Sequence, residues 1–199
     1  MTPSRLRGML LAATALLAAL VFLAWSQPWF TLELTASSGD PVPLEVRGDV
    51  AAAALPPLAL ALLAIVAALA LAGPALRTVF GVLEALLGGC VVAVTAVALG
   101  APVAASASAV TEVTGVGGSE SVAELVASVR VSAWPAVAIA VGVLVVVAGL
   151  SVALTARRWP ASGRRYSRTR IEAVGPAASD PIAEWDALSD GDDPTAPSR

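Results

Sequence analysis

Glu84 is the residue whose type and position could place chemistry inside an apolar stretch of this 199-residue chain. A carboxyl group in a membrane interior is costly, so such residues usually carry protons, bind substrates or bond to neighbouring helices. Arg77 precedes it on nearly the same face of a helix, about 10 Å away along the axis. We therefore predict that Glu84 and Arg77 form a candidate intramembrane polar site.

Three roles for Glu84 stay open at the level of the sequence. It could be a water-accessible carboxylate near the membrane surface, a group that couples protons or substrates, or a partner in a hydrogen bond between helices. We favour the first role, because the predicted helix places Glu84 within about two turns of its beginning.

The other side chains argue against cofactor and catalytic chemistry. The chain has no His and one Cys, Cys90, so an internal disulfide, thiolate clusters and the common zinc, haem and non-haem iron sites lack their ligands. The apolar segments hold no nucleophile–base pair and no paired carboxylates. We predict a protein that is not an enzyme, with no cofactor, no metal and no nucleic-acid partner.

The elements that must position Glu84 are long apolar segments. Hydrophobic residues make up 57% of the chain and its mean hydropathy is +0.82, whereas soluble domains are about 45–50% apolar. A helix needs about 20 apolar residues to cross a bilayer. We predict an all-α membrane protein with four transmembrane helices, at residues 8–25, 50–72, 78–99 and 134–155.

Other interpretations of these segments are weaker. Buried helices of a soluble protein would be shorter and would carry a polar stripe. A cleaved signal peptide would explain Arg5 and Arg7, but the first segment is long for one and no clean cleavage site follows it. Pro56 and Pro57 predict an irregular beginning of the second helix, and the alternative is a broken helix of the kind that marks transporter sites.

Arginine placement predicts that both termini lie in the cytoplasm. All 12 cations are Arg, which also indicates a GC-rich bacterial genome such as that of an actinomycete. Nine of them flank the spans on the side of the termini, whereas the two alternate loops hold only Arg47 and Arg130 among several acids. Because positive residues stay inside, we predict a multi-pass protein of the bacterial plasma membrane.

Aromatic and basic side chains at the ends of the spans predict contacts with lipid head groups. These expected anchors are Trp25, Trp29, Trp134, Trp159, Arg157, Arg158, Arg164 and Arg165. Within the third span, Gly81, Ala85, Gly88 and Gly89 are small residues three or four apart, a spacing that favours close packing of helices.

The two outer loops carry signals of local structure. Residues 29–35 and 44–47 flank a turn-like segment, so we predict a short hairpin. In the second loop, Ser121 and Glu124 match a capping box. Apolar residues with helical spacing follow, at Val122, Leu125, Val126 and Val129. We predict a short amphipathic helix at the outer membrane surface, with a lid over a cavity as the alternative.

The tail, residues 157–199, is predicted to be a separate unit that follows a transmembrane domain of residues 1–156. A basic juxtamembrane run leads through a disordered-looking linker to an acidic end. The predicted partner-binding motif comprises Ile182, Trp185, Leu188, Asp192 and Asp193. A solvated tail rarely contains Trp, so we expect this motif to bind a cytoplasmic protein or to fold back on the protein's own arginines.

Motifs at the end of the first span and in the tail form a recognisable combination. They are Ser26-Gln27-Pro28-Trp29, Arg158-Trp159-Pro160, Arg164-Arg165-Tyr166, Trp185-Asp186-Ala187-Leu188 and Gly191-Asp192-Asp193-Pro194-Thr195. The combination resembles the tryptophan-biosynthesis-associated membrane protein family of actinobacteria, over essentially the whole chain. The chain departs from that pattern at Ala161-Ser162-Gly163, in place of a Met-containing spacer, and at Ser189-Asp190, in place of Asp-Arg.

The resemblance implies a four-span protein encoded beside tryptophan-synthesis genes, and the name of the family records this neighbourhood and not a mechanism. We expect a membrane anchor or interaction protein that engages a soluble partner through its tail. The alternative is an accessory for transport or export of tryptophan or an aromatic intermediate, alone or as a homo-oligomer, although four helices without an internal repeat are few for a carrier. A purely structural or envelope-stress role also stays open.

Overall fold

The computed structural model describes residues 3–35 and 41–156. Contacts divide the chain into two units, Met1–Ser162 and Gly163–Arg199, and the second unit lies outside the described residues. The statements that follow concern the first unit alone.

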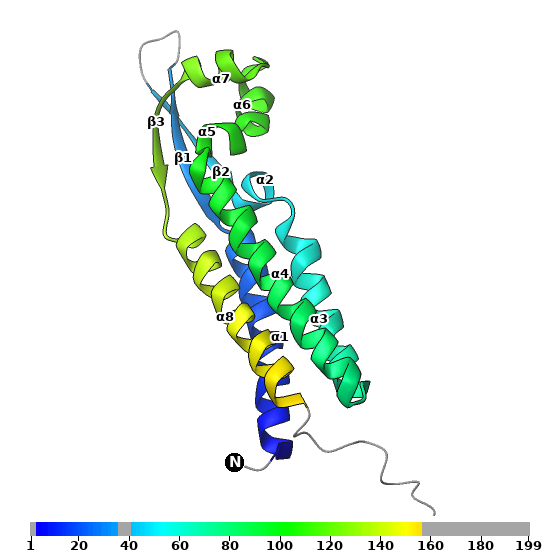
Figure 1. Cartoon of the computed structure of the whole chain (residues 1–199). Helices are drawn as coiled ribbons and strands as arrows, with labels where there is room; N and C mark the ends of the chain where they lie inside the picture. The colour runs from blue at the N-terminus through cyan, green and yellow to red at the C-terminus, as the bar shows by residue number, and fades with distance from the viewer. Residues whose placement is uncertain (1–2, 36–40, 157–199) are drawn as a thin grey trace, which may run out of the picture. The chain divides into compact units, whose positions relative to one another are not determined.

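Four helices form a bundle (Figure 1). They are α1 (Pro3–Trp25), α3 (Leu55–Leu71), α4 (Pro74–Gly100) and α8 (Trp134–Thr155). The last three begin with a Pro in the first turn, where its missing N–H costs no helical hydrogen bond. Because α3 and α8 each pack against both α1 and α4, the pair α1 and α4 lies across the bundle.

Three of the helices are long and apolar enough to cross a membrane, over Arg5–Trp25, Ala75–Gly100 and Trp134–Thr155. These correspond to the first, third and fourth predicted spans. The second prediction, a continuous helix over residues 50–72, is wrong in its extent, because α2 (Gly48–Ala51) ends before α3 begins. Pro56 and Pro57 lie in the first turn of α3. This agrees with the predicted irregular beginning of the second helix and not with a broken helix.

A small antiparallel sheet lies at one end of the bundle, where α1 ends (Figure 1). Its strands are β1 (Pro28–Leu34), β2 (Val42–Arg47) and β3 (Val126–Val131), in the order β2-β1-β3. Strands β1 and β2 are the two arms of the predicted hairpin, with Pro28 opposite Arg47 and Leu34 opposite Val42. The third strand was not predicted. Because the fold contains this sheet beside its helices, the predicted all-α class is corrected to a mostly helical fold with a small sheet.

The predicted amphipathic helix of the second loop is only half correct. Helix α7 (Ser119–Leu125) begins before Ser121, and no side chain caps it, so the predicted capping box is wrong. Val126 and Val129 belong to β3 and pair with Leu34 and Leu32 of β1. Their β-branched side chains suit a strand, and pairing gives the free edge of β1 a hydrogen-bonding partner.

Two further short helices, α5 (Pro102–Ala105) and α6 (Ala107–Thr114), lead from α4 to α7. Gly115 ends α6 with φ +71° and Gly118 precedes α7 with φ +100°, backbone conformations that favour glycine. The reversals between them fold α5, α6 and α7 against one another beside the sheet (Figure 1).

Glycines set the separation of α4 and α8. A Cβ added at Gly81 would lie 2.6 Å from the backbone nitrogen of Ala153, and one at Gly149 would lie 2.5 Å from the backbone nitrogen of Ala85. Gly88 similarly faces the carbonyl of Gly142. The predicted close packing of the third span is thus confirmed at Gly81, Ala85 and Gly88. It is wrong at Gly89, where a Cβ would meet nothing within 4 Å.

Candidate functional site

Glu84 lies in the interior of the bundle and is entirely buried. Its Oε1 atom is 2.6 Å from the Oγ1 atom of Thr14, which α1 contributes from across the bundle. Its Oε2 atom is also buried and has no hydrogen-bond partner within the part of the chain that the structure describes. The interpretation of Glu84 as a water-accessible carboxylate is therefore wrong, and the alternative of a hydrogen bond between helices is confirmed.

Two local features place Glu84 deeper than expected. Helix α4 begins at Pro74 rather than near residue 78, so Glu84 is about 15 Å from its beginning. Apolar side chains also close the bundle on both sides of the pair. Ile65, Leu69 and Val152 pack with Leu10 and Leu11 of α1 on one side, and the main core, which includes Leu17 and Ala18, lies on the other.

Thr14 belongs to this site, although it was not among the residues predicted from the sequence. Its hydroxyl is fully buried and also lies 3.0 Å from the carbonyl oxygen of Leu10 in the preceding turn. A signal was present, since Thr14 is the polar side chain in the middle of an otherwise apolar first span. Nothing in the sequence, however, showed that its face of α1 would meet Glu84.

The structure does not pair Arg77 with Glu84. Arg77 is buried on the same helix, and no ion pair forms between the two residues. Arg7 of α1 lies near enough to Arg77 for the two charges to interact, and it donates a hydrogen bond of 2.5 Å to the carbonyl of Ala70 near the end of α3. Arginines from α1 and α4 therefore gather at the end of the bundle where α3 ends.

The aromatic anchors occupy different environments. Trp29 has no exposed surface, and its indole N–H donates a 2.8 Å hydrogen bond to the carbonyl of Ala24. A side chain so placed cannot reach lipid, so its prediction as an interfacial anchor is wrong. Trp25 stacks edge-on against Phe22 and is half-buried, as is Trp134; their anchoring role stays a prediction.

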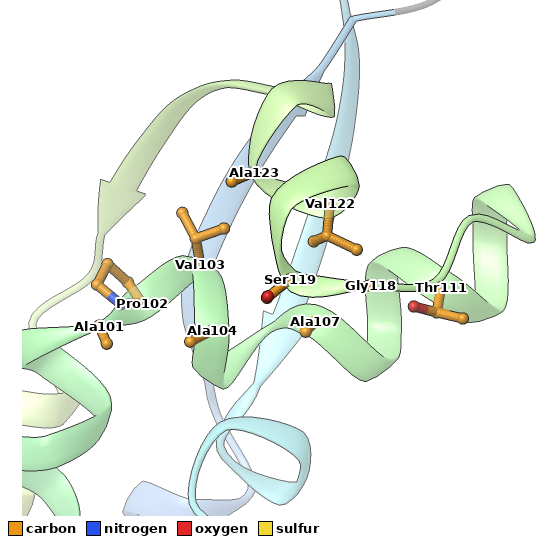
Figure 2. A pocket seen from close by; sticks show the side chains of 10 residues that line it. All are labelled: Ala101, Pro102, Val103, Ala104, Ala107, Thr111, Gly118, Ser119, Val122 and Ala123. Atoms are coloured by element: carbon orange, nitrogen blue, oxygen red, sulfur yellow. The ribbon is translucent and has the colours of Figure 1, made fainter.

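A hollow of about 480 Å³ lies among α5, α6 and α7 (Figure 2). Its lining is Ala101, Pro102, Val103, Ala104, Ala107, Thr111, Gly118, Ser119, Val122 and Ala123. Figure 2 shows the hydroxyls of Thr111 and Ser119 as the polar atoms among these side chains. Neither hydroxyl has a hydrogen bond within residues 3–35 and 41–156. The site can therefore accept an uncharged, largely apolar molecule with one polar group.

A second hollow, of about 530 Å³, lies beside the first. It is lined only by Ala and Val side chains from α2, α4, α5 and the segment before α3. Ala101 and Ala104 line both hollows, so α5 forms a thin wall between them. The sequence signal for both spaces was the run of alanines around residues 51–54 and 101–107, whose small side chains leave room between elements.

Several predicted residues lie outside the described part of the chain. They are Trp159, Arg157, Arg158, Arg164, Arg165, Ile182, Trp185, Leu188, Asp192 and Asp193. Among the residues that are described, no three His, Cys, Asp or Glu side chains are grouped so as to hold a metal ion.

Comparison with known proteins identifies a family. The family model described as tryptophan-associated transmembrane protein matches residues 11–195. No curated protein and no solved structure matches the chain. The match confirms the resemblance noted in the sequence, and together with the three long apolar helices it shows an integral membrane protein.

Proposed function

The chain belongs to the family of tryptophan-associated transmembrane proteins, and from this we propose that it anchors a soluble protein of tryptophan metabolism to the membrane through its tail. The observation that carries the proposal is the extent of the family match, which continues through the tail to residue 195. A tail that merely followed the last span would need no sequence shared with other members. The predicted partner-binding motif falls inside the match and comprises Ile182, Trp185, Leu188, Asp192 and Asp193.

The bundle suits the role of an anchor. The glycine contacts between α4 and α8 bring the two backbones together without intervening side chains. Leu55, Leu62 and Leu69 of α3 lie about two turns apart and are fully buried against the other helices. Such close packing gives a stable platform on which a cytoplasmic segment can act.

We propose further that α3 completes a four-span topology. Arg7, near the beginning of α1, bonds to Ala70 near the end of α3. At the other end of α1, a Cβ on Gly48 would lie 2.5 Å from the carbonyl of Trp25. Residues 48–70 therefore cover the same length of the bundle as residues 7–25, although α3 itself has 17 residues. A span of about 17 residues is at the lower limit for a bilayer.

Charge supports an orientation with both termini in the cytoplasm of a bacterial cell. Arg7 and Arg77 lie at the end of the bundle where α3 ends. At the other end, Arg47 donates to the carbonyl of Ser26, and Arg130 forms a 2.7 Å ion pair with Glu33. The acceptors of these two cations lie just before β1 and within it, so the two cations oppose translocation less than the arginines at the other end.

The tethering role is tested by purifying the full-length protein from its native membranes in mild detergent. The wild type is compared with Trp185→Ala and with Trp134→Ala, a matched control outside the tail. We expect a soluble enzyme of tryptophan metabolism to be retained by the wild type and by the control, and to be lost with Trp185→Ala. Equal retention by all three proteins, or retention of none, would contradict the proposal.

The uncharged hollow of Figure 2 favours a second candidate, an accessory for export of an aromatic intermediate. No charged side chain lines it, so zwitterionic tryptophan would leave two charges unpaired there, whereas a neutral indole-type molecule would not. Filling the space with Ala107→Leu should weaken indole binding to vesicles that contain the protein. Val113→Leu, on the same helix but outside the lining, serves as the control. Unchanged binding in Ala107→Leu vesicles would remove this candidate.

A further inference from the structure

We propose that Glu84 and Thr14 form a proton-binding site in the membrane interior, in which the Glu84 carboxyl group carries its proton and donates it to the Oγ1 atom of Thr14. This inference is independent of the tail and of the tethering role. The observations behind it are the number of hydrogen atoms at the contact, the burial of the carboxyl group, and the lack of an ion pair to Glu84 within residues 3–35 and 41–156.

The hydroxyl group of Thr14 lies between two oxygen atoms. Thr14 has one hydroxyl hydrogen and two oxygen atoms at bonding distance, the carbonyl of Leu10 at 3.0 Å and Oε1 of Glu84 at 2.6 Å. A helical hydroxyl ordinarily donates to the carbonyl four residues earlier. Thr95 and Ser151 do so in this protein. If Thr14 does the same, the hydrogen between Thr14 and Glu84 belongs to the carboxyl group.

Burial leads to the same assignment. An ionised carboxylate would distribute its charge over both oxygens, yet Oε2 is buried without a hydrogen-bond partner in the described part of the chain. An unpaired charge in this position is far more costly than an unpaired carbonyl oxygen. The protonated acid leaves only the carbonyl oxygen without a partner, and its hydroxyl is satisfied by Thr14.

The charges on the surrounding helices do not compensate an ionised carboxylate. Helices α3 and α8, which pack against α4, contain no titratable side chain. On α4 itself, Arg77 forms no ion pair with Glu84, and Cys90 is exposed. On α1, Arg7 donates to Ala70 and Arg5 is exposed near the beginning of the helix. The neutral acid is the form that these neighbours accommodate.

The site links protonation to the contact between α1 and α4. These helices lie across the bundle, and the Thr14–Glu84 hydrogen bond joins them through its interior. When the acid releases its proton to water, the remaining carboxylate can only accept hydrogen bonds, so Thr14 would have to turn its hydrogen away from Leu10. Ionisation thus replaces two hydrogen bonds by one and places a charge in the core.

Infrared spectroscopy of the full-length protein in lipid nanodiscs tests the assignment. A protonated carboxyl group has a carbonyl stretching band that a carboxylate lacks. At neutral pH we expect this band in the wild type, its loss in Glu84→Gln and its retention in Glu112→Gln, a control at an exposed position. Thr14→Val should shift the band to higher frequency, because the carboxyl group loses its acceptor.

Two results would overturn the proposal. One is a wild-type spectrum at neutral pH without the band. The other is a band that persists unchanged in Glu84→Gln. Should Glu84→Gln fail to fold, the comparison of Thr14→Val with Thr14→Ser decides: Ser keeps the hydroxyl and should keep the band position, and a band that moves in neither variant contradicts the assignment.

Discussion

Thr14 and Glu84 meet because two helices that lie across the bundle each turn a polar side chain toward its interior. Glu84 alone would be an unsatisfied polar group among apolar neighbours, whereas Thr14 also bonds to the carbonyl of Leu10 in its own helix. A single contact of 2.6 Å gives Oε1 of Glu84 a hydrogen-bond partner in Thr14, and the carbonyl of Leu10 accepts the second hydrogen bond of the Thr14 hydroxyl group. At the scale of the residue, the Thr14–Glu84 hydrogen bond is a specific polar contact between α1 and α4 inside the bundle.

Replacing Thr14 measures what the pair contributes to stability. Thr14→Val keeps the volume of the side chain and removes the hydroxyl, so Glu84 loses its partner. Hydrogen bonds between membrane helices contribute about 0.6 kcal/mol on average and up to about 1.7 kcal/mol. We expect a loss of this size in a reversible unfolding titration in detergent, with Thr14→Ser close to the wild type. Equal stability of Val and wild type would show that the hydrogen bond contributes nothing.

Trp29 is a core residue, so its substitution should destabilise the fold more than the substitution of a lipid-facing anchor. Trp29→Phe removes the N–H bonded to Ala24, and we expect a loss of about 1 kcal/mol. Trp29→Ala also empties a fully buried site and should cost about 3–5 kcal/mol. Thermal unfolding measures both. Trp134→Phe, at a half-buried position, should change stability by less; a lipid anchor at Trp29 would instead give losses similar to those at Trp134.

At the scale of the element, α4 and α8 depend on residues that have no side chain. Gly149 would place a Cβ 2.6 Å from the carbonyl oxygen of Gly81, a backbone atom that cannot rotate away. The helices must therefore separate if either glycine gains a methyl group. In lipid, van der Waals contact between the closely packed backbones stabilises the pair of α4 and α8, and the hydrophobic effect does not.

Alanine at these glycines is a direct test of the packing. We expect Gly149→Ala to destabilise the bundle by about 1–3 kcal/mol, the usual cost of overpacking. Gly89→Ala is the matched control on α4, because its Cβ would meet nothing within 4 Å. Its expected effect is neutral to slightly stabilising, by up to about 1 kcal/mol, since Ala favours a helix more than Gly. Similar losses in both variants would contradict the observed interface.

At the scale of the whole molecule, the number of spans determines on which side each loop lies. In the four-span topology, the hairpin and the α5–α7 region are outside, and the turn between α3 and α4 is in the cytoplasm. If α3 did not cross, that turn would lie outside and the α5–α7 region inside. The two arrangements also place the tail on opposite sides.

Single cysteines distinguish these topologies. In a Cys90→Ser background, Thr35→Cys, Gly73→Cys and Gly117→Cys occupy positions that are exposed or open to a new side chain. We expect a membrane-impermeant maleimide to label residues 35 and 117 on intact spheroplasts, and residue 73 only after permeabilisation. Labelling of residues 35 and 73 without residue 117 would indicate three spans and an external tail.

Features that depend on neighbours along the chain could be predicted from the amino-acid sequence. Apolar segments long enough to cross a bilayer lie at residues 8–25, 78–99 and 134–155, and the helices are found there. The hairpin followed from β-rich residues around a turn, and Glu84 was identified because an acid in an apolar helix is rare. Each of these signals is local.

Features that depend on contacts between distant parts of the chain became evident only in the folded protein. Residues 126–131 form a strand because β1, almost a hundred residues earlier, offers an edge with which to pair. Trp29, which belongs to β1, is buried because the end of α1 and Gly48 lie against its ring, and the carboxyl group of Glu84 finds a partner because Thr14 comes from the helix across the bundle. Periodicity and composition carry no information about which faces meet, so the partner of the acid could be found only in the folded protein.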